Sequence, residues 1–151
     1  MIVYRITNSL YKDDISGSGA KIKGARWNMP GISMLYTAGS ISLSALELLV
    51  HISFNDIQNF YHLLTISIPD DAAKEISADK LKTDWQEDED YTAFMGTGFL
   101  RNNTNLILKV PSAIITEEHN YLINPGHADF KKVKIKRSKQ FIFDKRLYIF
   151  K

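Results

Sequence analysis

Cysteine is absent from this sequence of 151 residues, which excludes disulfide bonds and thiolate ligands for a metal. Long apolar runs are missing as well, since no stretch approaches the roughly 20 apolar residues that a membrane-spanning helix needs. Residues 1–10 contain one positively charged side chain and no apolar run as long as that of a signal peptide. We therefore expect a cytoplasmic protein that does not contact a membrane.

Excess charge of one sign is also small, at +2, and this is too little to indicate a nucleic-acid partner by itself. The charge is unevenly distributed, because residues 84–90 are acidic and residues 131–139 contain six of the nineteen lysines and arginines. In the basic segment apolar and charged residues alternate, which predicts a strand with one solvated face. Such a strand is either a charged edge that resists aggregation or a surface for an acidic or phosphate-bearing partner.

The composition is that of a globular protein, with 44% hydrophobic and 24% charged residues, and the length fits a single domain over residues 1–151. A first half that contains helix and a second half rich in strands indicate a mixed α/β or α+β domain. The strongest helix candidate spans residues 40–54. A second helix is expected over 90–102, and a short one over 70–76. The expected strands are 3–6, 33–38, 60–69, 105–111, 112–116, 120–124, 132–136, 141–144 and 146–150.

Standard catalytic and metal-binding motifs are absent. The glycines of residues 16–24 have the spacing of neither a dinucleotide fingerprint nor a Walker A loop, and there is no His-Glu-x-x-His sequence. Ser112 lacks the sequence of a nucleophile elbow. Carboxylates and histidines lie close together in residues 117–129, which leaves a metal site as a minor alternative to ordinary polar surface. We expect no metal.

Arg26 and Tyr36 lie on either side of a proline turn, at the end of a long turn-rich loop. Long loops in compact domains tend to be functional. The guanidinium of Arg26 suits a phosphate or a carboxylate, but it can equally pair with Asp13 or Asp14. Tyr36 closes a strand, so its ring is either a core aromatic or a platform on which a flat ligand ring stacks. The neighbouring Trp27 is expected to pack in the core.

Glu47 is an isolated carboxylate in the apolar helix candidate. If it were buried without a partner, its charge would cost several kcal/mol. His51, one helical turn further on, is one possible partner; otherwise Glu47 faces a cleft as an active-site acid or charge stabiliser. Ser112 follows Pro111 at a strand end, where its hydroxyl can cap, turn or bind a ligand. An arginine, an aromatic ring, a carboxylate and a hydroxyl together suit an anionic ligand that has a flat ring and a sugar.

The sequence resembles the RES domain, the toxin half of bacterial RES–Xre toxin–antitoxin pairs. The resemblance covers nearly the whole chain and rests on several ordered motifs: VYRIT, SGSGAKIKGARWNMPGISMLYTA, SLSALELLVH, KVPSAIITEEHNYLINPGHADF and FIFDKRLY. The family is named for an arginine, a glutamate and a serine. By motif position these are Arg26, Glu47 and Ser112, and Tyr36 falls at the aromatic position counted with them.

This resemblance implies a fold similar to that of ADP-ribosyltransferase toxins, with NAD as the substrate. It implies that Arg26 holds a phosphate, that Tyr36 stacks on nicotinamide, that Glu47 stabilises the developing charge and that Ser112 orients the ribose or nicotinamide. Trp27 is included among the residues that contact NAD. The implied reaction is cleavage of the nicotinamide–ribose bond by hydrolysis or phosphorolysis, which depletes NAD and arrests growth.

Two alternatives remain at this stage. The same NAD site would serve a protein ADP-ribosyltransferase, and the chain could instead be a non-enzymatic module that binds its antitoxin. The resemblance implies a cognate Xre-type helix-turn-helix antitoxin as the partner, with DNA contacted only through that antitoxin.

Overall fold

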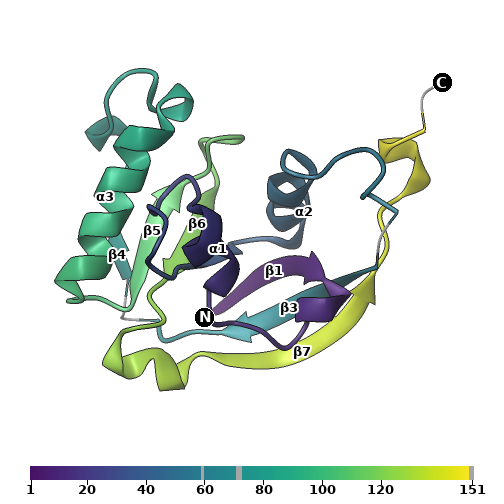
Figure 1. Cartoon of the computed structure of the whole chain (residues 1–151), viewed down its shortest axis with the longest axis horizontal. Coiled ribbons are helices and arrows are strands. Elements are labelled where there is room, and N and C mark those ends of the chain that lie inside the picture. Colours follow the sequence, from purple (N-terminus) through teal and green to yellow (C-terminus); the bar gives the residue numbers. More distant parts are fainter. Residues whose placement is uncertain (59, 71–72, 150–151) are drawn as a thin grey trace.

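A seven-stranded sheet forms the centre of the molecule. The computed structural model describes residues 1–58, 60–70 and 73–149, and its strands lie in the order β4-β5-β6-β2-β1-β3-β7 (Figure 1). Neighbouring strands are antiparallel except β4 and β5, which are parallel. The strands are β1 (Ile2–Asn8), β2 (Leu35–Ala38), β3 (Tyr61–Ser67), β4 (Ala73–Glu75), β5 (Ile107–Pro111), β6 (His119–Ile123) and β7 (Lys134–Phe141).

Three α-helices and five short 3-10 turns accompany the sheet, which confirms the expectation of a mixed α/β fold for the described residues. None of the helices in these residues is long and apolar enough to cross a membrane. The helices are α1 (Ser18–Lys23), α2 (Ile41–Leu49) and α3 (Glu89–Asn102), and the turns are η1 (Ser9–Tyr11), η2 (Ala78–Lys80), η3 (Trp85–Glu87), η4 (Ala128–Lys132) and η5 (Lys145–Leu147).

The sheet opens between its two central strands. Strand β1 pairs with β3 along its whole length but with β2 only at Tyr4 and Ala38. Beyond that pair the main chains diverge, so that β4, β5, β6 and β2 form one half of the sheet and β1, β3 and β7 the other (Figure 1). Side chains replace the missing ladder contacts: Ser44 Oγ accepts from the main-chain N–H of Ile6 at 2.9 Å, and Arg5 Nη1 donates to the carbonyl of Tyr36 at 3.1 Å.

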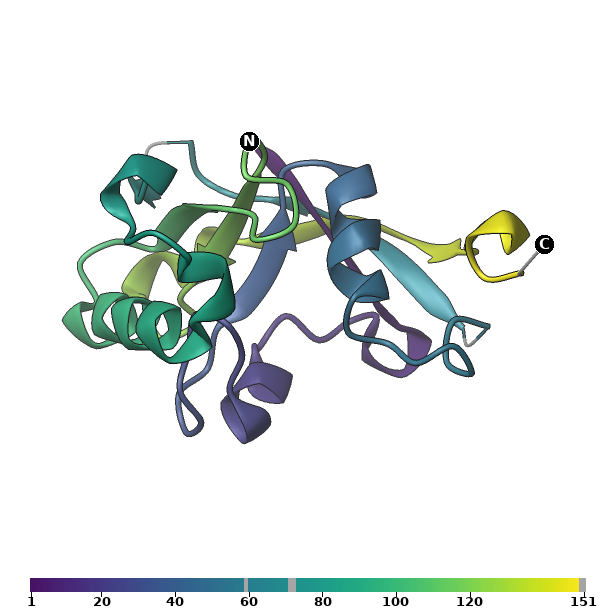
Figure 2. The same ribbon diagram turned by 90° about the horizontal axis from the view of Figure 1, so that it is seen from above.

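Each half of the sheet has its own helix. Helix α2 packs its apolar side chains against β1 and β3, in a cluster that includes Ile6 and Leu63. Helix α3 covers the other half with a cluster built around Trp27 and Trp85, whose ring centroids are 6.1 Å apart. In the view from above, α2 and α3 lie on either side of the opening (Figure 2). A fully buried large apolar side chain stabilises the fold by about 1.5–3 kcal/mol, so these clusters hold the two helices in place.

Local sequence sets the limits of the two long helices. The side chain of Ser40 accepts from the N–H of Leu43 and begins α2, whereas Asp88 does the same for Tyr91 and begins α3. Asn103 ends α3 in the left-handed conformation, with φ of 52°. Helix α2 ends at Leu49, so the expected extension to residue 54 is wrong.

Four other local expectations are also wrong. The strand expected over 141–144 is absent from the described residues, because β7 ends at Phe141. Ala73–Glu75 is a strand that pairs in parallel with β5, not part of a helix over 70–76, of which residues 71 and 72 lie outside the described residues. Residues 112–116 form a turn because the Ser112 hydroxyl accepts two main-chain N–H groups there. Lys145–Leu147 forms a 3-10 turn capped by Asp144, in place of a strand over 146–150, of which residue 150 lies outside the described residues.

Candidate active site

Glu47 lies in the last turn of α2 and bridges the two halves of the sheet. Its Oε1 accepts one hydrogen bond from Ser112 Oγ at 2.8 Å and another from Asn120 Nδ2 at 2.6 Å. Ser112 follows β5 and Asn120 lies in β6, so both donors come from the half of the sheet that α2 does not cover. His51, the partner that helical spacing suggested, is not a hydrogen-bond partner of Glu47 among the described residues.

Ser112 is fully buried, with 0% of its surface exposed. Its hydroxyl donates to Glu47 and accepts from the N–H groups of Ile114 and Ile115, at 3.0 and 3.2 Å. A serine hydroxyl has one donor and two acceptor positions, and all of these are occupied. This geometry favours a role in holding Glu47, and the direct contact of Ser112 with ribose or nicotinamide stays a prediction.

Tyr36 is anchored at its hydroxyl group. The hydroxyl donates to Asn28 Oδ1 at 2.7 Å and accepts from the N–H of Trp27 at 3.0 Å. Burial raises the pKa of the Tyr36 hydroxyl above its ordinary value, and the Trp27 hydrogen bond and the nearby Arg26 charge offset this only in part. The buried Asn28 in turn donates to the carbonyls of Ala20 and Ile32, so the position of the Tyr36 ring is tied to the loop that carries Arg26.

The loop around Arg26 is seated on one face of α3. Thr92 Oγ1 donates to the carbonyl of Arg26 at 2.6 Å, and the N–H of Met29 donates to Thr97 Oγ1 at 2.9 Å. Between these threonines, a Cβ on Gly96 would lie only 1.8 Å from the carbonyl oxygen of Trp27. The helix therefore needs glycine at residue 96 because the main chain of the loop occupies the place of a side chain.

The guanidinium of Arg26 has one carboxylate partner, and one of its nitrogen atoms is left without a hydrogen bond among the described residues. Its Nη2 lies 3.5 Å from Glu89 Oε1, so its carboxylate partner is Glu89 and not the expected Asp13 or Asp14. Its Nη1 is buried and has no hydrogen-bond partner within the part of the chain that the structure describes. Buried N–H groups are nearly always paired in folded proteins, and charged donors bind anions strongly. An anion bound beside Arg26 would supply the missing acceptor, and the phosphate contact of Arg26 stays a prediction.

Arg5 is a second such arginine, and the sequence reasoning missed it. It lies in β1, donates through Nη1 to the carbonyl of Tyr36, and its Nε is buried without a partner. Burial lowers the pKa of Arg5, and the charge of Asp14 offsets part of this effect. Arg5 Nε and Arg26 Nη1 are the two side-chain atoms in this condition within the described part of the chain. The signal in the sequence was a charged residue inside the apolar strand VYRI.

The pairing of β2 with β6 connects the residues around Tyr36 with those around Glu47. Tyr36 lies opposite Leu122 and Ala38 lies opposite Asn120, which makes Tyr36 and Asn120 diagonal neighbours on one face of the sheet. Such neighbours are roughly 7–8 Å apart, and their Cβ atoms are somewhat closer. The ring of Tyr36 and the side chain that holds Glu47 therefore lie on the same face of the sheet.

The histidines and carboxylates of residues 117–129 make separate local contacts. In the described ranges no three histidine or carboxylate side chains gather where they could hold a metal ion. His119 lies 3.9 Å from Glu75. His127 caps the turn at Asp129 through its ring nitrogen. These side chains therefore have local structural contacts in place of a shared ligand.

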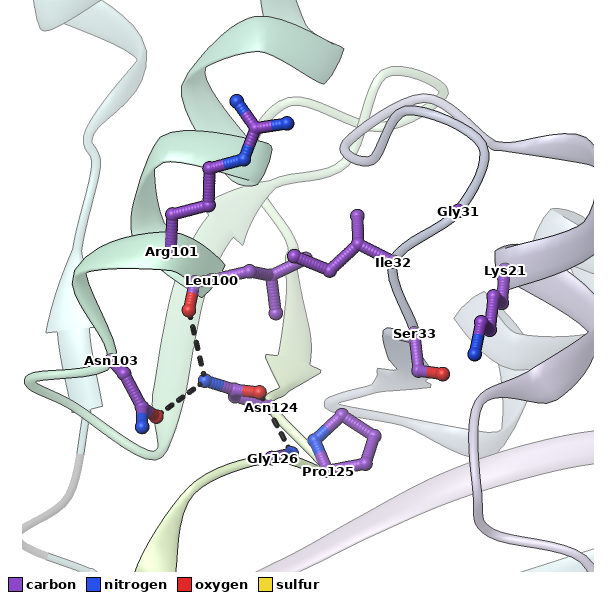
Figure 3. A pocket seen from close by; sticks show the side chains of 10 residues that line it. All are labelled: Lys21, Gly31, Ile32, Ser33, Leu100, Arg101, Asn103, Asn124, Pro125 and Gly126. Atoms are coloured by element: carbon purple, nitrogen blue, oxygen red, sulfur yellow. Dashed lines mark hydrogen bonds between the residues drawn. The ribbon is translucent and has the colours of Figure 1, made fainter.

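A separate pocket of about 510 Å³ lies between the C-terminal end of α3, the loop before β2 and the turn after β6 (Figure 3). Asn124 forms part of its wall and donates to Asn103 Oδ1 at 2.9 Å. Glu47, Arg5 and Arg26 are not among the residues that line it. The lining residues are Lys21, Gly31, Ile32, Ser33, Leu100, Arg101, Asn103, Asn124, Pro125 and Gly126.

Residues 2–144 match the model of the RES domain. The chain belongs to the RES domain family. Among curated relatives, Toxin Res of Photorhabdus laumondii is 36% identical over 151 residues, covering 97% of each chain. The Prs ADP-ribosylating toxin of a Sphingobium species is 34% identical over 140 residues, which cover 89% of this chain and 87% of the relative. The family therefore agrees with the resemblance read from the motifs.

A solved structure supports the fold of this RES domain. The chain superposes on a chain of the Mycobacterium tuberculosis MbcT–MbcA toxin–antitoxin complex with a TM-score of 0.75. The match covers 97% of this chain and 86% of the other at 20% identity, so it shows a shared fold. The expected mixed α/β fold is therefore confirmed.

Within the RES domain, the arginine, glutamate and serine come from three elements. Arg26 lies in the loop on α3, Glu47 in α2 and Ser112 at the end of β5. The structure brings Glu47 and Ser112 into direct contact, and it ties Tyr36 to Trp27, next to Arg26. Trp27 itself is buried in the α3 cluster, with 2% of its surface exposed, which agrees with its expected packing role, and its contact with NAD stays a prediction.

Proposed function

We propose that this RES domain is the toxin of a toxin–antitoxin pair, that it acts in the cytoplasm, and that it cleaves NAD at the bond between nicotinamide and ribose. The curated relatives are named toxins, and one of them is named for ADP-ribosylation, a reaction for which NAD is the donor. The observation that carries the proposal is the Glu47 carboxylate, which is oriented by two hydrogen bonds across the opening in the sheet.

The substrate fits the distribution of charge around Tyr36. Arg5 and Arg26 each have a buried donor without a partner, and a pyrophosphate has enough oxygen atoms to satisfy both. The ring of Tyr36 offers a stacking surface for the nicotinamide ring, which adds a cation–π contribution of about 0.5–2 kcal/mol while that ring is charged. Anion and ring would thus be bound close to the Glu47 carboxylate.

Cleavage of the bond between ribose and nicotinamide depends more on a carboxylate that stabilises positive charge than on a group that donates a proton. When the bond between the ribose carbon C1′ and the ring nitrogen breaks, the electron pair goes to the ring, which leaves as neutral nicotinamide. Positive charge develops on the ribose, as in glycoside cleavage. Glu47 stabilises this charge in the transition state more than in the ground state. Water or phosphate then bonds to C1′, and a water acceptor releases its proton to solvent.

A second candidate function uses the same site with a protein acceptor. The name of the Sphingobium relative, an ADP-ribosylating toxin, supports this protein ADP-ribosyltransferase. A non-enzymatic antitoxin-binding module is a third candidate, and the exposed basic strand β7 is its main support. In each case we propose an Xre-type helix-turn-helix antitoxin as the partner, and we propose that DNA is contacted only through that partner. We also propose that residues 1–151 form a single RES domain.

Product analysis tests these candidates. Purified protein without antitoxin is incubated with NAD, with and without inorganic phosphate, and the products are resolved by mass spectrometry. Free ADP-ribose identifies a hydrolase, and phosphate-dependent ADP-ribose phosphate identifies a phosphorylase. Transfer of labelled ADP-ribose to an added cell extract identifies the second candidate. An intact NAD pool with no labelled protein would contradict both enzymatic proposals.

A further inference from the structure

Asn120 has a side-chain amide whose orientation is fixed by chemistry. It lies in β6, half-buried, and its Nδ2 is 2.6 Å from Glu47 Oε1. An ionised carboxylate only accepts hydrogen bonds, so the amide must present its NH₂ group to Glu47 and its oxygen to the other side. The position of the Asn120 oxygen therefore follows from that of the carboxylate.

That oxygen is open. Among the residues that the structure describes, Asn120 Oδ1 accepts no hydrogen bond, and the buried polar atoms without a partner are Arg5 Nε and Arg26 Nη1. Asn120 Oδ1 therefore has some surface that is accessible to solvent. Glu47 Oε2 also accepts no hydrogen bond among the described residues and is not one of those buried atoms, because both hydrogen bonds of that carboxylate fall on Oε1. One bond therefore links two side chains that each present one free acceptor oxygen.

Two linked acceptors call for two adjacent donors. The cis hydroxyl groups of a ribose are such a pair, whereas the carboxamide of nicotinamide offers donors at one nitrogen only. Asn120 also lies diagonally across from Tyr36 on the same face of the sheet, next to the proposed stacking position of the nicotinamide ring. The acceptor pair is therefore placed where the sugar attached to that ring would lie.

We propose that Asn120 contacts the substrate: its Oδ1 accepts a hydrogen bond from one hydroxyl group of the nicotinamide-bearing ribose, while its Nδ2 holds Glu47. This inference rests on the function proposed above. It gives Asn120 a role in substrate recognition in addition to its role in positioning the carboxylate, and the two roles differ in what they do to modified substrates.

The test combines variants of Asn120 with substrates that lack one hydroxyl group. The value of kcat/KM is measured for NAD and for its 2′-deoxy and 3′-deoxy analogues at the nicotinamide ribose, with wild type, Asn120→Ala and Asn120→Ser. A lost neutral hydrogen bond corresponds to roughly a tenfold loss. We expect the wild type to lose about that factor on the analogue that lacks the partner of Asn120 Oδ1, and more on the other analogue, whose missing hydroxyl would face the charged Glu47 carboxylate. Both variants should become indifferent to the removal of the hydroxyl group that Asn120 binds.

The contrary result is equally defined. If the Asn120 variants lose the same factor as wild type on both analogues, Asn120 only positions Glu47 and the proposed contact is wrong. A loss that follows the carboxamide, tested with the nicotinic acid form of the dinucleotide, would also overturn it. Asn102→Ala, an exposed asparagine at the end of α3, is the matched control, and thermal unfolding checks that each variant is folded.

Failure of the proposed function gives a different pattern. If the wild type binds NAD without cleaving it, the same comparison is made on dissociation constants measured by calorimetry, and the expected loss of discrimination applies to them unchanged. If the wild type neither cleaves nor binds NAD, the proposed function and the contact fall together. If the wild type cleaves NAD and the Asn120 variants distinguish NAD from its deoxy analogues as the wild type does, only the proposed contact of Asn120 is wrong.

Discussion

Ser44 Oγ accepts a hydrogen bond of 2.9 Å from the main-chain N–H of Ile6, at the place where β1 leaves β2. The side chain of a helix here replaces a strand as the partner of β1. Because Glu47 lies three residues further along α2, the contact also fixes the helix face that presents the carboxylate to Ser112 and Asn120. The Ser44 hydroxyl group thus supports both the opening in the sheet and the orientation of Glu47.

Removing that hydroxyl should affect both stability and catalysis. Ser44→Ala leaves a buried N–H without a partner, which costs about 1–3 kcal/mol, and it loosens the seat of α2. We expect a lower free energy of unfolding in urea and a lower kcat for NAD cleavage. Ser42→Ala, at an exposed residue of the same helix, is the control. Equal stability of the two variants would contradict the role given to Ser44.

Adding a methyl group at residue 96 of α3 tests how the Arg26 loop packs on this helix. Gly96→Ala places a Cβ against the carbonyl of Trp27, and overpacking of this kind costs about 1–3 kcal/mol. The Arg26 loop must then move, so the KM for NAD should rise as well. Gly98→Ala, where a Cβ meets nothing within 4 Å, should instead gain about 0.5–1 kcal/mol from helix propensity. Thermal unfolding and initial rates of NAD cleavage are measured for both variants. Similar behaviour of the two variants would contradict the packing of the Arg26 loop against Gly96.

The two incompletely paired arginines should act mainly in binding. Lysine keeps the charge but loses the planar fork, so Arg5→Lys and Arg26→Lys should each raise the KM for NAD by roughly 10-fold or more, with a smaller change in kcat. Arg101→Lys, at an exposed residue of α3, controls for the substitution itself. An unchanged KM in Arg5→Lys would remove that residue from the anion site.

The environment of Tyr36 predicts its behaviour at high pH. Burial raises the pKa of its hydroxyl above the ordinary value near 10. A raised pKa in the folded state gives stability that is present below the unfolded pKa and is lost as the pH rises above it. Tyrosinate absorbance of wild type and Tyr36→Phe should therefore coincide through pH 10 and separate only as the chain unfolds. A difference of one tyrosine in the ordinary range would contradict this burial.

Sequence reasoning found the residues whose local surroundings were unusual. Glu47 stood out as a carboxylate in an apolar helix, and Arg26 as an arginine in a turn-rich loop, so both could be predicted from their neighbours along the chain. Their partners could not, because Ser112 and Asn120 lie 65 and 73 residues from Glu47, and Glu89 lies 63 residues from Arg26. Spacing along a chain favours near neighbours, which is why His51 and the loop aspartates were suggested.

Strand residues were harder to assign for a related reason. Arg5 lies in an apolar strand, and its importance depends on β1 separating from β2 after one residue pair. Asn120 matters because register places it opposite Ala38 and beside Tyr36. The turn at residues 112–116 likewise formed because a side chain offered its hydroxyl to the main chain, where the sequence had predicted a strand.

The central claim is that the Glu47 carboxylate drives cleavage of NAD, and one comparison tests it most directly. NAD consumption is measured for wild type, Glu47→Gln and the control Glu117→Gln, an exposed glutamate, each purified without antitoxin and checked for folding. Glutamine keeps the shape of the side chain and removes its charge. We expect wild-type rates in Glu117→Gln and a loss of roughly 100-fold or more in Glu47→Gln, the size typical of removing one electrostatic stabiliser. NAD consumption by Glu47→Gln at the wild-type rate would contradict the account.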